Sequence, residues 1–255
     1  HQSDSPMGKG DSTGDFRSFQ FGDALDNIVM NESLKNALVS GGIDELRLTQ
    51  EDLVVEEAYQ NTSLSTVLMI DISHSMILYG EDRITPAKMV AMALAEWITT
   101  KYPKDTLDII VYGNESWPIQ IKDLPYLQVG PYHTNFVAGL ELAMGLLKRR
   151  KSANKQIFNI TDGKPSCLVE PDGSFYKNSF GLDPYITGKC LEMAAKTKKA
   201  KIPVNTFMIA KDAYLQHFIR SFSEINGGNA YYTGLNKLGQ LIFSDYQQQK
   251  KRNSK

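Results

Sequence analysis

Short apolar segments alternate with longer segments of helical periodicity from about residue 63 onward. The first apolar segment, Thr66–Ile70, is rich in β-branched residues and free of charge, which indicates a strand buried on both faces of a parallel sheet. Further strands are predicted at Thr106–Tyr112, Gln156–Thr161, Val204–Ile209 and Ala230–Tyr232. The intervening segments predict helices at Thr85–Tyr102, Asn135–Arg149, Pro184–Lys199, Ala213–Asn226 and Leu235–Tyr246.

This alternation predicts an α/β fold with a doubly wound, mostly parallel central sheet and helices on both faces. Trp117–Ile121 follows the turn signal Gly113-Asn114 and is expected to return as an edge strand. Open sheets of this kind bind ligands at the carboxyl ends of their strands. Residues that directly follow each strand are therefore the first candidates for a functional site.

The N-terminal part has a different composition. Residues 1–20 are rich in Gly, Ser and Asp, which is typical of a flexible tail. Residues 21–62 contain a helix-compatible stretch, Asp26–Ser40, and short strand-like stretches at Leu46–Leu48 and Leu53–Ala58. We expect them to form a small extension that packs on the main domain. Residues 63–248 would then be the α/β domain, and residues 249–255 a second flexible tail.

Composition narrows the classes of partner. The net charge of −1 provides no electrostatic attraction for nucleic acid or an anionic membrane. No apolar stretch reaches the roughly 20 residues that cross a bilayer. The two cysteines, Cys167 and Cys190, fit incidental thiols in a reducing compartment better than a disulfide scaffold, although a single bridge stays open. These features predict a soluble, cytoplasmic protein.

The sequence Asp71-Ile72-Ser73-His74-Ser75 follows the first buried strand. If the chain stays extended there, the side chains of Asp71, Ser73 and Ser75 point to one side. One carboxylate and two hydroxyls form an all-oxygen cluster with a single formal charge. Such a cluster suits a hard cation that keeps some of its water, such as Mg²⁺ or Mn²⁺.

Asp71-x-Ser73-x-Ser75 resembles the first segment of the metal-ion-dependent adhesion site (MIDAS) of von Willebrand factor A (VWA) domains. That site has two further segments, a Thr on a later loop and an Asp after a later strand. Thr134 and Asp162 stand at the matching places, in Tyr-His-Thr-Asn and Ile-Thr-Asp-Gly. Three segments in the right order are far more specific than D-x-S-x-S alone.

The resemblance implies a Rossmann-like VWA fold and a role for each residue. Ser73 and Ser75 would bind the metal through their hydroxyls, and Thr134 directly or through water. Asp71 and Asp162 would act mainly through bound water and by holding the loop. The ion would keep an exchangeable position for an Asp or Glu carboxylate of a protein partner.

Two histidines lie beside these residues. The family often has Gly before the Thr, and His133 stands there in this chain, where a bulkier side chain alters the loop or screens the ion. His74 and His133 also suggest Zn²⁺, but no Cys or His partner has zinc-like spacing. We therefore expect both to be loop residues rather than metal ligands.

Other segments are similar to bacterial intracellular VWA proteins over roughly residues 20–248. They include Leu48–Leu53 (LTQEDL), Tyr102–Asp105 (YPKD), Ile160–Pro165 (ITDGKP) and Gly228–Tyr232 (GNAYY). Such proteins commonly accompany MoxR-type AAA+ ATPases. The resemblance implies an adaptor or co-chaperone that recognises target complexes during assembly or metal insertion. The loop 163–183 beside the metal residues is a candidate for partner recognition.

Alternative functions make different demands on the same residues. A phosphatase with Asp71 as nucleophile needs a second acid two residues later, and Ser73 occupies that position. The sequence has no phosphate-binding G-x-x-x-x-G-K-[ST] loop. We therefore expect a binding module and not an enzyme, with an extracellular adhesion module as the second hypothesis.

Overall fold

The computed structural model describes residues 16–23, 25–41, 47–56, 63–80, 82–209, 212–232, 234 and 237–253. The chain divides into two compact units, one of residues 1–62 with 250–255 and one of residues 63–249. Most of the expected N-terminal tail, residues 1–15, lies outside the described part of the chain.

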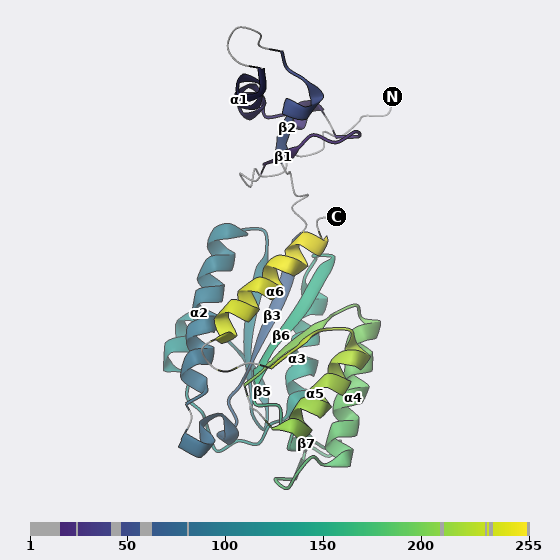
Figure 1. Ribbon diagram of the computed structural model, residues 1–255. Helices are drawn as coiled ribbons and strands as arrows, with labels where there is room; N and C mark the ends of the chain where they lie inside the picture. The colour runs from purple at the N-terminus through teal and green to yellow at the C-terminus, as the bar shows by residue number, and fades with distance from the viewer. Residues whose placement is uncertain are drawn as a thin grey trace. The chain divides into compact units, whose positions relative to one another are not determined.

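The larger unit contains a six-stranded sheet in the order β10-β9-β6-β3-β4-β5 (Figure 1). Its strands are β3 Leu64–Asp71, β4 Thr106–Tyr112, β5 Ser116–Ile119, β6 Asn154–Thr161, β9 Val204–Met208 and β10 Ala230–Tyr232. All neighbours are parallel except β5, which pairs antiparallel with β4 at the edge. The predicted mostly parallel α/β sheet is therefore confirmed.

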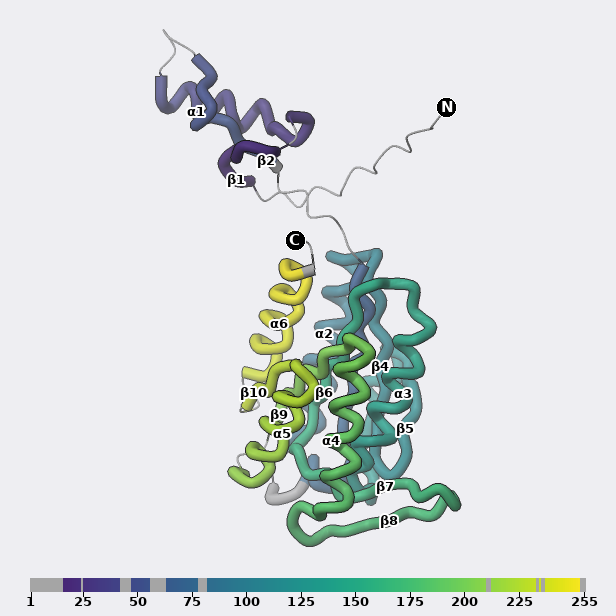
Figure 2. The backbone as a smooth tube through the Cα atoms, turned by 90° about the vertical axis from the view of Figure 1, so that its right-hand side faces the viewer, coloured from purple at the N-terminus to yellow at the C-terminus, as the bar shows by residue number. Residues whose placement is uncertain are grey.

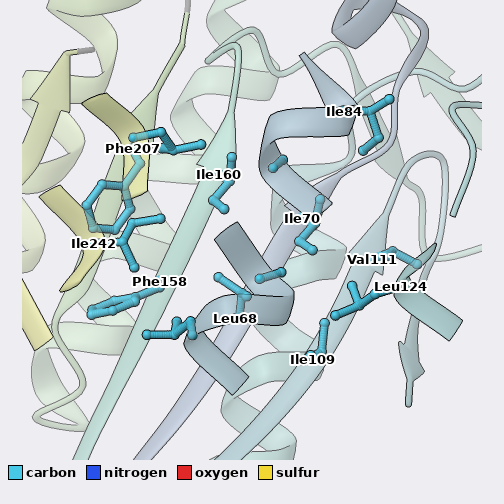
Figure 3. Packing of buried hydrophobic residues seen from close by; sticks show 14 of the residues in the cluster. Leu68, Ile70, Ile84, Ile109, Val111, Leu124, Phe158, Ile160, Phe207 and Ile242 are labelled. Atoms are coloured by element: carbon cyan, nitrogen blue, oxygen red, sulfur yellow. The ribbon is translucent and has the colours of Figure 1, made fainter. Parts of the chain in front are cut away.

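Helices cover both faces of this sheet (Figures 1 and 2). On one face lie α2 Ile84–Lys101 and α6 Leu238–Asn253, and on the other lie α3 Phe136–Arg149, α4 Pro184–Lys199 and α5 Ala213–Asn226. The central strand β3 feeds both layers, because successive side chains of a strand point to opposite faces. Leu68 and Ile70 join the first cluster, shown in Figure 3, whereas Val67 and Met69 join the second.

Two segments of the larger part of the chain differ from the prediction. Helix α6 continues to Asn253, through residues expected to be a flexible tail, because its Gln and Lys residues favour helix and its last turn is basic. The expected loop 163–183 contains a hairpin of β7 Cys167–Val169 and β8 Phe175–Lys177.

Across the described ranges, no helix combines the length and apolarity needed to span a membrane.

The smaller unit is a short two-stranded sheet beside one helix. Strand β1, Phe16–Ser18, lies in the expected flexible tail but pairs antiparallel with β2, Val54–Glu56. Helix α1, Met30–Gly41, begins later than predicted because residues 25–27 form a 3₁₀ turn. Residues 47–49, which overlap the expected strand Leu46–Leu48, are irregular.

The turn between α5 and β10 depends on Asn226 and the two glycines that follow it. Gly227 ends α5 with a φ of 84°, which favours glycine. A Cβ on Gly228 would lie 2.1 Å from the carbonyl oxygen of Val204. The buried Asn226 side chain accepts from the Val204 N–H at 2.7 Å and donates to the carbonyl of Ile202 at 3.1 Å. One amide therefore fixes the start of β9.

We expect Asn226→Ala to lower the free energy of unfolding by about 3 kcal/mol, because it leaves buried main-chain groups without partners. Urea denaturation followed by circular dichroism measures the change. Gln247→Ala, at an exposed position of α6, is the control and should stay within about 0.5 kcal/mol of wild type. Equal stability of the two variants would contradict this role of Asn226.

Candidate metal centre

Two buried carboxyl groups lie at the carboxyl ends of the neighbouring central strands. Asp71 is the last residue of β3 and Asp162 directly follows β6. The two strands are parallel and hydrogen-bonded, so their ends meet at one edge of the sheet. Asp71 is 0% exposed and Asp162 is 3% exposed. Strand order thus places two acids from distant parts of the chain in one buried corner.

Both oxygens of Asp71 accept hydrogen bonds. The backbone N–H of Ser73 donates to Oδ1 at 2.9 Å, and the hydroxyl of Thr161 donates to Oδ2 at 2.7 Å. Thr161 also accepts from the N–H of Gly163 at 3.0 Å. Asp71 therefore holds the start of the serine loop and the end of β6 together.

The serine loop continues into a 3₁₀ segment, His74–Gly80. The hydroxyls of Ser73 and Ser75 lie 3.0 Å apart, and Ser73 is buried. Burial raises the pKa of Asp162, and a hydrogen bond from the Ser75 side chain partly offsets that rise. Asp71, Ser73, Ser75 and Asp162 are thus connected in one group.

The two carboxyl groups make the site electrostatically costly. Burial raises the pKa of Asp71 to about 7, and the nearby Asp162 charge adds to the rise. Arg83 forms an ion pair with Asp162, but its Nη1 lies 3.7 Å from Oδ2, longer than a hydrogen bond. Two desolvated carboxylates beside serine hydroxyls are a donor set that fits a hard divalent cation.

Thr134 approaches the same edge from the loop before α3. Its N–H donates to the Ser166 hydroxyl at 3.1 Å, and its carbonyl accepts from the N–H groups of Ser166 and Cys167. Together with Thr161 and Gly163 it lines a narrow crevice. Within the described ranges it makes no hydrogen bond to the other four candidate ligands. The structure therefore brings four of the five predicted residues into direct interaction and places Thr134 at the adjoining crevice.

The main-chain N–H groups of the two histidines donate hydrogen bonds that connect the loops. The N–H of His74 donates to the Tyr132 carbonyl at 3.0 Å, and the N–H of His133 donates to Asn114 Oδ1 at 2.8 Å. Burial lowers the pKa of His133, and the charges of Lys177 and Lys164 lower it further. In the described part of the chain no three His, Cys, Asp or Glu residues gather as a metal-ligand group. The bond from His74 joins the serine loop to the Thr134 loop.

Three residues that shape the centre carried no predicted role. Thr161 buttresses Asp71, Ser166 holds Thr134, and Arg83 is paired with Asp162. Thr161 lies within the segment Ile160–Pro165 and Ser166 directly follows it, so the family resemblance of that segment was a local signal for both residues. Arg83 carried none, because its position follows only from the packing of α2 on the sheet.

A family profile described as "Rv0959-like protein, vWA domain" matches residues 64–247. A second profile, "Rv0959-like protein, third domain", matches residues 11–58. The chain is also 29% identical over 246 residues to the uncharacterized proteins Rv0959 of Mycobacterium tuberculosis and Mb0984 of Mycobacterium bovis. The alignment covers 93% of this chain but 36% of those relatives, so the chain spans about a third of their length.

Solved structures share the fold at low sequence identity. The vWF domain of the pili tip protein Mfa5 from Porphyromonas gingivalis has a TM-score of 0.60 at 11% identity, covering 73% of this chain and 95% of that one. The PilB minor pilin from Streptococcus sanguinis has a TM-score of 0.59 at 17% identity, covering 79% and 64%. BatB from Bacteroides thetaiotaomicron has a TM-score of 0.55 at 14% identity, covering 74% and 99%.

Replacing the buried charge of Asp71 should stabilise the protein in metal-free buffer. The carboxyl has its pKa raised from 3.8 to about 7, so the stabilising effect of its protonation is lost as the pH rises through that interval. Asp71→Asn is neutral throughout, and its advantage over wild type should grow to about 3 kcal/mol near pH 8. Urea titrations in chelator between about pH 5 and pH 8 measure the difference. A gap that does not change with pH would contradict the burial of a charged Asp71 as its cause.

The two thiols should be unreactive in the folded protein. Cys167 and Cys190 are both buried and free, which excludes a bridge between them. Burial raises the pKa of Cys167 to about 11 and also raises that of Cys190. We expect DTNB at neutral pH to label neither thiol in native protein and both in denaturant. Rapid native labelling of Cys167 would show that the hairpin opens.

Proposed function

The chain belongs to the Rv0959-like proteins and carries their vWA domain, and from this premise we propose that it is a metal-dependent protein-binding module. One observation carries the proposal: two buried carboxyl groups and two neighbouring serine hydroxyls share one edge of the sheet, and the ion pair of Arg83 with Asp162 is long. A divalent cation compensates such a group, and a carboxylate from a partner completes its coordination.

The residues divide between holding the ion and holding the loops. The hydroxyls of Ser73, Ser75 and Thr134 would hold Mg²⁺ or Mn²⁺, with Asp71 and Asp162 contributing mainly through water. When bound, the ion supplies a Lewis-acidic position for an Asp or Glu side chain of the partner. Asp71 keeps the N–H of Ser73 and the hydroxyl of Thr161 in place, so the ligands are arranged before the ion arrives.

Binding suits this geometry better than phosphoryl transfer. A nucleophilic carboxylate must reach its substrate, and Asp71 is fully buried with both oxygens hydrogen-bonded. Ser73 stands where a phosphatase with an Asp nucleophile needs its second acid. We therefore propose that the module binds without turnover.

The proposed setting is cytoplasmic, as an adaptor or co-chaperone for a MoxR-type AAA+ ATPase in the assembly or metal insertion of target complexes. The resemblance of Leu48–Leu53 and Ile160–Pro165 to proteins that accompany such ATPases supports this setting. The β7–β8 hairpin also presents half-exposed side chains next to the centre, including Val169, Phe175 and Tyr176. Adhesion is the second candidate, but the likeness to pilus proteins at 11% and 17% identity carries the fold alone.

Mg²⁺ should raise the melting temperature of the wild-type protein, because a ligand that binds only the folded state stabilises it. At a Mg²⁺ concentration of a hundred times the dissociation constant, this stabilisation is about 2.7 kcal/mol. Asp71→Ala should fold and lose the response, and Thr134→Ala should weaken it. Thr100→Ala removes an exposed hydroxyl of α2 and is the matched control with a normal response. Differential scanning fluorimetry with Mg²⁺, Mn²⁺ and chelator measures all four proteins. A normal Mg²⁺ titration of Asp71→Ala would contradict the proposed centre.

The partner class has its own test. A purified MoxR-type AAA+ ATPase from the same organism, used as bait, should retain the full chain in Mg²⁺ and release it in chelator. Generic aryl phosphates should not be hydrolysed under the same conditions. Hydrolysis that requires Asp71 would favour the phosphatase. Retention of the chain in chelator would show that the metal centre does not take part in binding the ATPase.

A further inference from the structure

A second pocket lies next to the metal loops. Its volume is about 560 Å³, and it is lined by Asn114, Glu115, Trp117, Tyr132 and Phe175. They come from the β4–β5 turn, from β5, from the loop that carries Thr134, and from β8 of the hairpin. None of the five belongs to the proposed ligands, so the pocket needs a separate explanation.

Its aromatic walls are fixed in position. The rings of Trp117 and Tyr132 meet edge to face, with centroids 6.2 Å apart. The Tyr132 ring lies directly over two glycines, since a Cβ would fall 2.6 Å from its side chain at Gly113 and 2.1 Å at Gly130. No larger residue fits at either glycine without moving the ring. The backbone is therefore shaped to hold Tyr132 at the pocket.

Glu115 gives the pocket its charge. It is exposed, it is the one formally charged residue of the lining, and its carboxylate has no hydrogen bond or ion pair among the described residues. The neighbouring Lys177 places its Nζ 5.1 Å from the centroid of Phe175, so a ring of this lining already receives a cation. Aromatic faces with a nearby carboxylate bind organic cations, and a planar guanidinium also stacks on such rings.

We propose that this pocket receives an arginine side chain of the protein partner, beside the acidic side chain that the metal binds. The binding of an acidic side chain by the metal rests on the proposed function, whereas the binding of arginine is inferred from the pocket itself. The two sites are joined by Tyr132, whose ring lines the pocket and whose carbonyl accepts from His74 of the serine loop. Thr134 follows two residues later on the same loop. A short segment with one acid and one arginine therefore fits both sites.

The pocket can be tested without metal. In a Trp97→Phe background, Trp117 is the one remaining tryptophan of the chain and its fluorescence reports on the pocket. N-acetyl-arginine amide should change that fluorescence saturably, and the neutral N-acetyl-citrulline amide should not. Glu115→Gln should weaken arginine binding about threefold, whereas Glu96→Gln, at an exposed position of α2, should not. If Trp97→Phe disturbs folding, the indole N–H of Trp117 in ¹⁵N-labelled wild type gives the same readout.

Peptides with arginine and aspartate joined by glycine–serine spacers of increasing length test the combined site. One spacing should bind more tightly than the aspartate-only peptide in Mg²⁺, and Glu115→Gln should remove the gain. The proposal is overturned if arginine amide leaves Trp117 unchanged or if Glu115→Gln binds it equally well. Metal-dependent binding of the aspartate peptide is read separately, so failure of the pocket and failure of the metal centre are distinguishable.

Discussion

The structure depends on placing two carboxyl groups in a desolvated corner at the ends of adjacent parallel strands. Asp71 and Asp162 reach that corner because β3 and β6 pair in the centre of the sheet. Their burial raises the pKa of both groups, so the metal-free fold carries an electrostatic cost. For the proposed metal site, such a cost is a familiar compromise between stability and function.

Hydrogen bonds donated by main-chain N–H groups hold the three loops of the centre in place. The Asp71 carboxylate accepts from the N–H of Ser73, and the Tyr132 carbonyl accepts from the N–H of the next residue, His74. The Ser166 hydroxyl accepts from the N–H of Thr134. The bonds of Tyr132 and Ser166 join segments far apart in the sequence. The scaffold therefore arranges these loops, and the proposed ion and partner would have little left to order.

The functional surface extends beyond the proposed ligands. Tyr132 belongs both to the link between the metal loops and to the wall of the aromatic pocket. The β7–β8 hairpin contributes Phe175 to the pocket. Its residue Cys167 also donates a main-chain hydrogen bond to the carbonyl of Thr134, which lies at the centre. Partner recognition and metal binding would thus share one set of loops. The chain covers about a third of its relatives' length.

The sequence by itself determined the parallel sheet, its helices and the places of Asp71 and Asp162 at strand ends, because apolar periodicity and strand-end position are local signals. The meeting of the two acids depends on the pairing of β3 with β6, which only the tertiary structure decided. Tertiary structure alone decided the position of Arg83 and the pocket around Trp117 and Tyr132. Those features arise from the packing of segments distant in the chain, for which no local pattern exists. Strand β1 formed for the same reason, since a three-residue strand is specified by its partner and not by its own composition.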